Sequence, residues 1–531
     1  MKRNTKFTTL ALLLLLGAVA LFLILSQGIT AMNWMIPALL LAWLLLFGIW
    51  FLGFGNLPFK KRIGLFLIGL GVFFTLGFLG KFLLRYEGSS SGSSFPKFAW
   101  VWEKEAEAAP PGKALVRTEV SQEEQRLQDA TADSTDFLGP DRDGTWAELP
   151  FSPEWSSSPP ELLWRRAVGK AWSSFAVENG KAITQEQAGN AERILCLHLF
   201  TGEEIWHHEN PDTRLLLVKK ENTGVKMGGD GPRSTPVIHE NKVIVVGATG
   251  IVNCLDLENG TEIWSANTIR DFGGEVQKWG IANAPLILPT EKAVLVAGTD
   301  SVSGEKGVTY AAFALDSGEV RWTYRGEGAS YSSPRLLEIS GTRQIVSINR
   351  ESVSGIDPST GDELWRFAWK GHYPKVGQPL QVDENTLLVT ASYGAGSLLL
   401  DLTREGNSWT VSERWKSNRM KTKFSSAVIL GNLAYGLDEG RLAAIDLETG
   451  DKAWKNQKYG FGQQLLFGDH LLVQVEQGPV VIGKASPEGF EELGRIEDAL
   501  SSMTWNIPVV AGRILLVRND REAACYLLPK R

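Results

Sequence analysis

Charged and aromatic residues recur in short segments that each precede an apolar, strand-like run. The segments are GGDGPR, QKWG, SYSSP, HYPKVG, KTKFSS and TWNIP. Their candidate binding residues are Asp230, Arg233, Lys278, Trp279, Tyr331, Tyr373, Lys375, Lys423 and Trp505. Such side chains bind anionic and aromatic groups by ion pairing, cation–π contact and stacking. If the segments converge, we expect a recognition surface for a peptide or an anionic small ligand. The alternative is a set of ordinary loops in which Arg233 pairs with a nearby acid.

The residues that most often hold metals or carry out catalysis give a weaker signal. Cys196, Cys254 and Cys525 each lie in an apolar run, and the sequence has no CxxC, CxxCH or Cys-Cys pair. Zinc, covalent haem and a vicinal disulfide therefore lack sequence support. His207 and His208 are adjacent in a strand-like run, so their side chains point to opposite faces. We expect no catalytic residue and no metal site.

A repeated phrase sets the elements that must position the candidate residues. It reads CLHLFTGEEIW, CLDLENGTEIW, FALDSGEVRW, GIDPSTGDELW and AIDLETGDKAW, with a degraded copy in LLLDLTREGNSWTVSERW. An apolar run, a turn with glycine and a return strand together predict a β-hairpin. The tryptophans at this position, with one in the isolated strand ELLWRRAV, are Trp164, Trp206, Trp264, Trp322, Trp365, Trp415 and Trp454. We interpret them as apolar plugs between neighbouring repeats rather than as ligand-binding residues.

The spacing of the phrase predicts a β-propeller. The copies recur at roughly 40 to 58 residues, the period of a four-stranded blade. We count eight blades: six carry the phrase, a seventh has lost its tryptophan, and the last, NIPVVAGRILLVRNDREAACYLLPKR, has only three strands. The strand 161–168 would complete that blade and close the ring. We therefore predict an all-β propeller of eight four-stranded antiparallel blades over 137–531.

The first 86 residues have a different composition. Three apolar runs, at about 8–25, 35–54 and 63–84, are each near the ~20 residues that a helix needs to cross a bilayer. They predict an α-helical membrane domain of three transmembrane helices over 1–86. Basic residues before the first run and between the second and third place the N-terminus in the cytoplasm. We expect a multi-pass protein of the cytoplasmic (inner) membrane, with a flexible linker over 87–136 and the propeller on the periplasmic side.

The phrases resemble the quinoprotein-type repeat, named for enzymes that use pyrroloquinoline quinone (PQQ). Its LDxxTGxxxW signature is visible at 256–264, 357–365 and 446–454, with Asn for Thr in the first and Ile for Leu in the others. GDGPRSTPV, KWGIANAPL, YSSPRL and FLGPDRDG are similar to a group of PQQ-like propeller proteins described mainly from planctomycete-type bacteria. The propeller lipoprotein of the outer-membrane barrel assembly machinery looks like a relative with the same eight-bladed plan.

The resemblance implies the fold more firmly than an activity. Quinoprotein dehydrogenases hold PQQ between a vicinal disulfide and a tryptophan, beside a calcium ion, and this sequence lacks the cysteine pair. We therefore predict a membrane-anchored cell-envelope module that binds a protein or peptide without catalysis and without a cofactor. The alternative is a PQQ-dependent oxidoreductase of the alcohol or aldose dehydrogenase type, with PQQ and calcium; a carbohydrate-binding module rests only on aromatic content. Residues 87–531 are acidic overall, which argues against a nucleic-acid partner.

Overall fold

The structure is a computed structural model. It describes residues 58, 60–61, 63–64, 66–68, 82–89, 96–102, 122–215, 229–298, 307–371 and 373–531. The chain divides into two compact units, Met1–Glu105 and Ala106–Arg531.

The described part of the first unit contains a β-hairpin. Strand β1 (Leu84–Ser89) pairs antiparallel with β2 (Pro96–Trp100), and Leu84 lies opposite Trp100. The rings of Trp100 and Trp102 stack with centroids 4.9 Å apart.

The prediction of a membrane domain with three transmembrane helices is contradicted. No helix formed by the described residues is long and apolar enough to cross a membrane. The predicted spans at about 8–25 and 35–54 lie outside those residues, and of the third only 63–64, 66–68 and 82–84 are described. Its last residue, Leu84, begins strand β1 instead of ending a helix. The sequence LRYEGS alternates apolar and polar residues at its start, a pattern that suits a paired strand.

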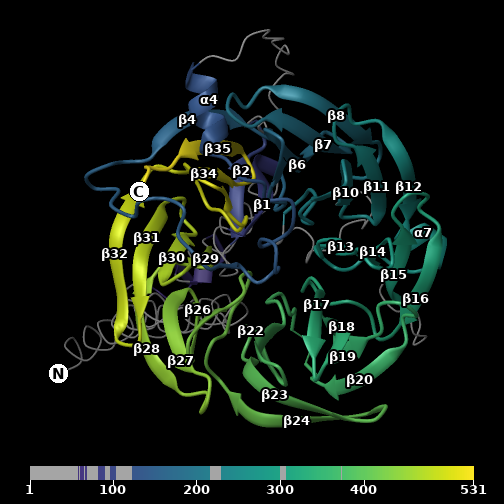
Figure 1. The fold of residues 1–531 in the computed structure, drawn as a ribbon. Coiled ribbons are helices and arrows are strands. Elements are labelled where there is room, and N and C mark those ends of the chain that lie inside the picture. Colours follow the sequence, from purple (N-terminus) through teal and green to yellow (C-terminus); the bar gives the residue numbers. More distant parts are fainter. Residues whose placement is uncertain are drawn as a thin grey trace, which may run out of the picture. The chain divides into compact units, whose positions relative to one another are not determined.

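The second unit is a ring of eight blades (Figure 1), which confirms the predicted eight-bladed propeller. Blades 1 and 2 contain β5 (Ala176–Glu178), β6 (Lys181–Ala188), β7 (Ala191–His198), β8 (Glu204–Asn210), β9 (Val237–His239), β10 (Lys242–Val246), β11 (Ile251–Asp256) and β12 (Glu262–Asn267). Blades 3 and 4 contain β13 (Leu286–Leu288), β14 (Ala293–Ala297), β15 (Val308–Ala314), β16 (Val320–Arg325), β17 (Arg335–Ile339), β18 (Thr342–Ile348), β19 (Ser352–Ile356) and β20 (Glu363–Ala368).

The remaining blades follow the same order from the channel outward. Blades 5 and 6 contain β21 (Leu380–Asp383), β22 (Thr386–Ala391), β23 (Gly396–Glu405), β24 (Ser408–Ser417), β25 (Val428–Leu430), β26 (Leu433–Asp438), β27 (Arg441–Asp446) and β28 (Lys452–Lys458). Blades 7 and 8 contain β29 (Gln463–Phe467), β30 (His470–Gln474), β31 (Val480–Ser486), β32 (Gly489–Ile496), β33 (Val509–Ala511), β34 (Ile514–Arg518), β35 (Glu522–Leu527) and β4 (Glu161–Ala167). A short helix, α7 (Thr268–Phe272), follows β12.

Strand β4 closes the ring. It comes from the start of the propeller and pairs antiparallel with β35 at its end, so that Trp164 lies opposite Cys525. This pairing leaves the last blade with four strands, like the others. It is the pairing that the isolated Trp164 strand predicts.

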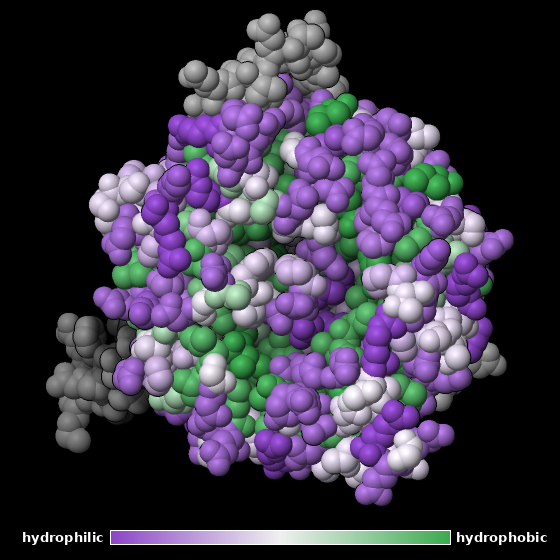
Figure 2. Space-filling view, in the orientation of Figure 1, coloured by the Kyte–Doolittle hydropathy of each residue, from purple (hydrophilic) through white to green (hydrophobic). Residues whose placement is uncertain are grey.

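Burial explains the residue types along each blade. The second and third strands of a blade are covered on both faces by neighbouring blades, so β14 and β15 are buried throughout and read as continuous apolar runs. The outermost strands carry more exposed residues, and in β8 buried and more exposed residues alternate. Five innermost strands directly follow a proline, whose missing N–H does little harm there; these prolines are Pro236, Pro285, Pro334, Pro379 and Pro508. In the face shown in Figure 2, polar residues dominate the rim.

The repeated tryptophans join one blade to the next. Six of the indole N–H groups donate to a backbone carbonyl oxygen of the following blade at 2.8 to 3.1 Å. The pairs are Trp164 with Leu199, Trp206 with Leu257, Trp264 with Leu315, Trp322 with Pro358, Trp415 with Leu447 and Trp454 with Ser486. Trp365 differs, because its N–H donates to the Gln344 side chain of its own blade.

Two constraints require glycine in the repeated turn: the backbone angle and the space available for a side chain. At Gly260 the backbone φ is +72°, which side chains rarely adopt. A Cβ atom there would lie 2.5 Å from the ring of Trp206 in the preceding blade. Glycines in the same turn cover the tryptophan of the preceding blade at Gly202, Gly318, Gly361 and Gly450.

Residues 134–146, hereafter the channel plug, lie inside the ring. Ser134 bridges to Val177 on β5, and the carbonyl oxygen of Thr135 accepts a hydrogen bond from Ile238 on β9. Strand β3 (Thr145–Trp146) pairs parallel with β29, the innermost strand of blade 7. The channel plug therefore touches the innermost strands of blades 1, 2 and 7.

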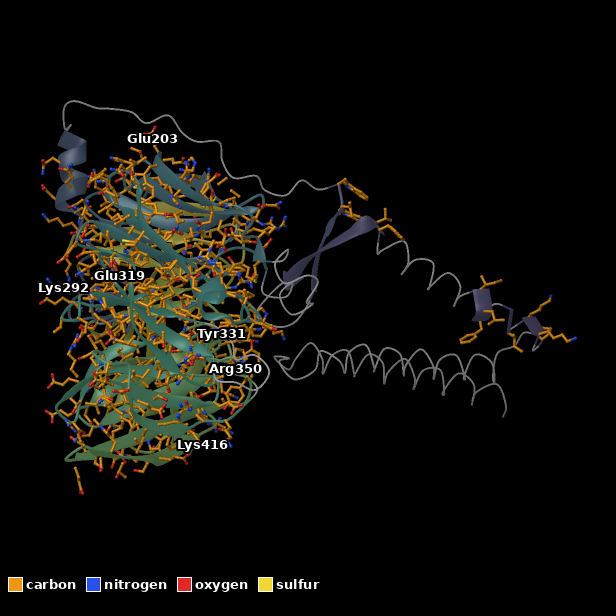
Figure 3. The ribbon with its side chains drawn as sticks, turned by 90° about the vertical axis from the view of Figure 1, so that its right-hand side faces the viewer. Glu203, Lys292, Glu319, Tyr331, Arg350 and Lys416 are labelled. Atoms are coloured by element: carbon orange, nitrogen blue, oxygen red, sulfur yellow. The ribbon has the colours of Figure 1, made fainter. Side chains whose placement is uncertain are left out.

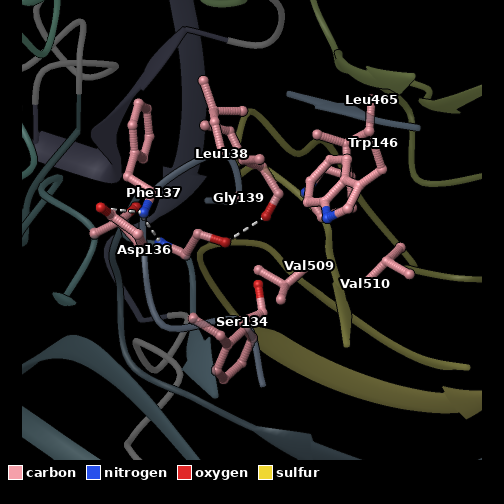
Figure 4. Close-up of a pocket in the computed structure, with 14 residues that line it drawn as sticks. Ser134, Asp136, Phe137, Leu138, Gly139, Trp146, Leu465, Val509 and Val510 are labelled. Atoms are coloured by element: carbon pink, nitrogen blue, oxygen red, sulfur yellow. Dashed lines mark hydrogen bonds between the residues drawn. The ribbon is translucent and has the colours of Figure 1, made fainter. Parts of the chain in front are cut away.

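Arginines hold the channel plug at its centre. The buried Arg142 pairs with Asp136 and donates to the carbonyl oxygen of Pro285 at 2.8 Å. Arg335 donates to the carbonyl oxygen of Asp141 at 2.6 Å. Burial raises the pKa of Asp136, although Arg142 acts in the opposite direction. A small cavity separates the plug from β33, and Ser134, Asp136 and Val509 line it (Figure 4).

The plug enters from the face where the innermost strands end. Helix α4 (Gln122–Asp129) precedes it, and Leu127 and Ala130 are buried against blades 8 and 1. The carbonyl oxygen of Ala130 accepts a hydrogen bond from Arg513, in the turn after β33. The end of the predicted 87–136 linker thus packs onto the propeller.

Candidate functional site

The loops that enter the innermost strands gather at one face of the ring, hereafter the mouth. Figure 3 shows Tyr331, from one of these loops, on one face and Lys292, from a turn that follows an innermost strand, on the opposite face. Seven of the eight loops contribute a partly exposed aromatic side chain; the eighth, 211–236, is described only at 211–215 and 229–236. This aromatic collar consists of Trp172, Trp279, Tyr331, Tyr373, Phe424, Phe461 and Trp505.

Four collar residues form a continuous aromatic cluster. Trp172 contacts Trp505 with ring centroids 4.6 Å apart, and Trp505 contacts Phe424 at 4.5 Å. Phe424 in turn meets Phe461 at 6.2 Å with the rings edge to face. Each ring comes from a different loop, so the cluster links blades 5, 6, 7, 8 and 1. Tilted and edge-to-face pairs of this kind are favoured by the ring quadrupoles.

A buried acid fixes the aromatic cluster in place. Glu476 accepts a hydrogen bond from the Trp505 indole N–H at 2.9 Å and another from the Phe461 backbone N–H at 3.1 Å. The carboxylate is 3% exposed. A Cβ atom at Gly460 would lie 2.4 Å from its Oε2, so the loop must carry glycine there. The cluster is therefore preorganised before any partner arrives.

Lys423 lies among the aromatic rings. Its Nζ is 4.3 Å from the ring centroid of Phe461, 4.9 Å from that of Tyr393 and 5.8 Å from that of Phe424. Burial lowers the pKa of Lys423 to about 8, while Glu439 and Glu476 oppose this shift. The position suits a cation held by aromatic faces.

A second lysine has a similar environment in the loop between blades 4 and 5. Lys375 is fully buried, and its Nζ lies 4.9 Å from the Tyr373 ring centroid and 5.3 Å from that of Trp369. The ammonium donates to the carbonyl oxygen of Arg350. Burial lowers the pKa of Lys375 to about 8.

Lys278, Trp279 and Tyr331 form a separate contact between blades 2, 3 and 4. The Trp279 and Tyr331 ring centroids are 5.5 Å apart, and Lys278 Nζ lies 4.8 Å from the Trp279 ring centroid. Lys278 is exposed. The backbone N–H of Tyr331 also donates to the carbonyl oxygen of Lys375, at 3.0 Å. This contact extends the collar around the mouth.

Asp230 and Arg233 take part in a buried polar network between blades 1 and 2. Asp230 pairs with Arg214, whereas Arg233 donates to the carbonyl oxygens of Gly231 and Gly229 at 2.5 and 2.8 Å. Burial raises the pKa of the nearby Glu192 to about 8. The alternative interpretation of the sequence was that Arg233 pairs with a nearby acid in an ordinary loop. The contacts of Asp230 and Arg233 fit such a structural role at least as well as they fit ligand binding.

The structure brings the predicted residues to one face but into several groups. Trp505 and Lys423 join the aromatic cluster, Tyr373 and Lys375 form a second group, and Lys278, Trp279 and Tyr331 a third. The sequence analysis did not include Trp172, Phe461 or the acid Glu476 among the candidate binding residues. Trp172 had a signal, because AWSSFAV matches SYSSPRL in its position before an innermost strand. Phe461, in YGFGQQLL, lies at the same position with a shorter loop.

The described residues do not fit a PQQ and calcium site. They contain no group of three or more His, Cys, Asp or Glu side chains that could hold a metal ion. Calcium takes six to eight oxygen ligands. Cys196, Cys254 and Cys525 are free thiols buried on separate strands, so no two of them can form a disulfide cap. Burial raises the pKa of Cys196 to about 12, which leaves no reactive thiolate near neutral pH.

Comparison with known proteins gives one family and a broad set of similar folds. The model of the family described as "Outer membrane protein assembly factor BamB" matches residues 190–456, just over half of the chain. A protein of that name from Burkholderia pseudomallei strain K96243 is 23% identical over 282 residues, covering 44% of this chain and 71% of that protein.

The similar solved structures include quinoprotein enzymes. A europium-containing methanol dehydrogenase has a TM-score of 0.58 and 11% identity, covering 77% of this chain and 100% of that one. The quinohemoprotein alcohol dehydrogenase from Comamonas testosteroni has a TM-score of 0.54 and 13% identity, covering 76% and 81%. At such identities the likeness shows the fold alone.

The predicted location, a multi-pass protein of the cytoplasmic membrane, is contradicted. The described residues provide no membrane-spanning helix. The matched family and its curated relative are named as outer membrane protein assembly factors. Apolar composition alone suggested the spans, and such composition does not establish a membrane helix.

Proposed function

We propose that this chain, which belongs to the family of the outer membrane protein assembly factor BamB, is a protein-binding scaffold whose mouth holds a segment of a cell-envelope protein. The aromatic collar carries this proposal. Its rings are partly exposed, come from seven loops and surround one end of the channel. Aromatic residues are enriched in the energetically important centres of protein interfaces.

The preorganisation of the collar supports binding. Glu476 holds Trp505 and Phe461, and the rings of the aromatic cluster hold one another. Side chains that are already ordered lose little conformational entropy when a partner binds. A preorganised, partly exposed aromatic surface therefore suits recognition. The described residues contain no group of three or more His, Cys, Asp or Glu side chains that could hold a metal ion.

Site-specific photo-cross-linking in the native cells tests the proposal. The full chain would carry a photo-reactive residue at Lys278, which is exposed at the mouth, or at Lys292, which is exposed on the opposite face. We expect a discrete protein adduct from position 278 that is absent from position 292. Equal adducts from both faces, or none from the mouth, would contradict a partner bound at the mouth.

Two tryptophan substitutions connect the adduct to the collar. Trp172→Ala removes a partly exposed ring of the aromatic cluster, and we expect it to weaken the adduct at position 278. Trp409→Ala is the matched control, because Trp409 is also partly exposed but lies on β24 of blade 5, at the outside of the ring. If the adduct persists in Trp172→Ala but is lost in Trp409→Ala, the partner binds at the rim and not at the mouth.

A further inference from the structure

The mouth carries an excess of positive charge on the side of blades 4 to 6. Three segments there, 349–351, 369–379 and 418–424, contain six lysines or arginines and one acid, Glu351. The turn after β26 contacts Lys421 and adds a second acid, Glu439, so the cations still outnumber the acids. We name four of these cations the basic arc: Arg350, Lys370, Arg419 and Lys421. The first three are exposed and Lys421 is partly buried. The whole chain has a net charge of −6, so the basic arc is opposite in sign to the molecule.

At blades 1 and 2, two described arginines of the mouth lie in ion pairs with acids: Arg214 with Asp230 and Arg270 with Asp271. The exposed Lys278, in the loop between blades 2 and 3, is a further cation there. Acidic groups of a partner are attracted to the basic arc. Charge complementarity of this kind steers association and excludes partners of the wrong sign.

The basic arc is continuous with the aromatic cluster. Arg419, Lys421, Lys423 and Phe424 belong to one loop between blades 5 and 6. Lys423 then touches Phe461 of the next loop through its Nζ, 4.3 Å from the ring centroid. Cations and aromatic rings thus face the same short stretch of a bound segment.

We propose that the mouth recognises an extended, acidic peptide segment that carries an aromatic or large aliphatic side chain. The acidic groups pair with the basic arc, and the apolar side chain packs on the aromatic cluster. This inference rests on the proposed function and adds the chemistry of the partner. A basic segment would meet Arg350, Lys370, Arg419 and Lys421 with like charge.

Single-stranded nucleic acid also combines negative charge with stacking groups, and it is an outcome of the test. Proteins that bind it use a basic groove with aromatic platforms. The basic arc covers only part of the mouth, and two arginines described at blades 1 and 2, Arg214 and Arg270, lie in ion pairs with acids. A peptide with localised acidic groups matches this distribution better than a uniformly charged backbone.

The test measures binding of synthetic probes to the full chain by fluorescence anisotropy. The main probe is an acidic peptide of about ten residues, roughly 35 Å when extended, with one phenylalanine. Three comparison probes are the same peptide with lysine for each acid, the acidic peptide with alanine for phenylalanine, and an oligothymidylate of equal charge. We expect the main probe to bind at least about tenfold more tightly than each comparison probe, and less tightly as salt is added.

Charge-reversal variants connect the binding to the basic arc. Lys370→Glu, Arg419→Glu and Lys421→Glu together should weaken the main probe by at least about tenfold. The control combines Lys292→Glu, Arg321→Glu and Lys452→Glu, which change the net charge equally at exposed positions outside the mouth. The control should change the affinity by less than about twofold, since distant exposed charges are screened. Thermal unfolding of both variants checks that they fold.

Each other result overturns the inference. Equal binding of the acidic and basic peptides removes the charge argument, and equal binding of the alanine peptide removes the apolar anchor. Tighter binding of oligothymidylate assigns the mouth to nucleic acid. If the main probe does not bind but the Trp172-dependent adduct still forms in cells, the acidic segment is rejected and the scaffold proposal stands. Loss of both rejects the proposed function itself.

Discussion

Two groups of tryptophans in this propeller differ in position, burial and partners. Those of the outer ring recur at one repeat position, are mostly buried, and in six cases donate to a backbone carbonyl oxygen of the next blade. Those of the aromatic collar lie in loops of different length, are partly exposed and contact other collar rings. A tryptophan at a repeat position is explained by packing, whereas one outside the repeat needs another explanation.

The joint between blades 4 and 5 sharpens this comparison. Trp365 is 5% exposed like the others, but its N–H donates to Gln344 Oε1 within its own blade. The next blade has replaced the usual turn with a longer hairpin, and Gly406 in that hairpin touches nothing within 4 Å. The buried N–H of Trp365 still requires an acceptor, so the Gln344 side chain takes the place of the backbone carbonyl oxygen used at the other joints.

The largest expected effect is the loss of an outer-ring tryptophan. Trp264→Ala should lower the free energy of unfolding by about 3–5 kcal/mol, because it empties a buried site between blades 2 and 3. Trp172→Ala at the mouth should cost markedly less, since its ring is already partly exposed. Urea unfolding followed by far-ultraviolet circular dichroism compares the two. Similar losses for both variants would erase the distinction between the regions.

The glycine that covers an outer-ring tryptophan should matter beyond its backbone angle. Gly318→Ala introduces left-handed strain, about 1–2 kcal/mol, and a Cβ atom 2.7 Å from the Trp264 ring. Gly341→Ala carries the same strain, with φ of +66°, but meets nothing within 4 Å. The difference in melting temperature between the two variants isolates the contact with tryptophan. We expect Gly318→Ala to melt lower; equal melting would mean that the contact relaxes freely.

The exceptional joint offers a smaller test. Gln344→Leu leaves the buried N–H of Trp365 without its acceptor and should cost about 1–3 kcal/mol. A phenylalanine at position 365 in the same background removes that N–H and should recover part of the loss. Chemical denaturation of the single and double variants gives the coupling energy directly. Additive losses would show that the hydrogen bond contributes nothing measurable.

The smallest expected effect is a pH dependence from Lys423. Its pKa of about 8 in the folded protein lies below the value near 10.4 of an unfolded chain. Between these values the folded protein binds fewer protons, so the stability rises as pH increases from about 8 to about 10. Lys423→Met lacks this rise. Melting temperatures of the two proteins at several pH values test it, and parallel curves would show that Lys423 does not contribute.

The repeat made the fold predictable. The phrase around Trp264 carries a strand, a turn and a return strand in twelve residues, and its period and number specify eight blades. The segment FLGPDRDGTW occurs once, so nothing in the sequence indicates that Arg142 reaches the carbonyl oxygen of Pro285 inside the ring. The apolar runs of the first 86 residues suggested membrane helices from composition alone, and Leu84 instead begins a strand.

The mouth was predictable in place but not in detail. Residues such as Lys423 and Trp505 precede apolar runs, and this position was enough to predict that they lie on one face of the ring. Their grouping depends on loop length. The four residues before β29 place Phe461 close to Phe424. The longer loop before β33 places Trp505 in contact with both Phe424 and Trp172. Glu476 gave no signal, since a buried acid in a hairpin turn cannot be told from a solvated one before its partners are known.

The channel plug restricts how any guest can use the mouth. Because residues 134–146 cross the inside of the ring and are held there by Arg142 and Arg335, the propeller is a cup with a floor rather than a tube. A polypeptide cannot be threaded from one face to the other. A segment that enters must either end inside the cup or turn back on itself, so a chain terminus or the tip of a loop can dock where the middle of a taut strand cannot.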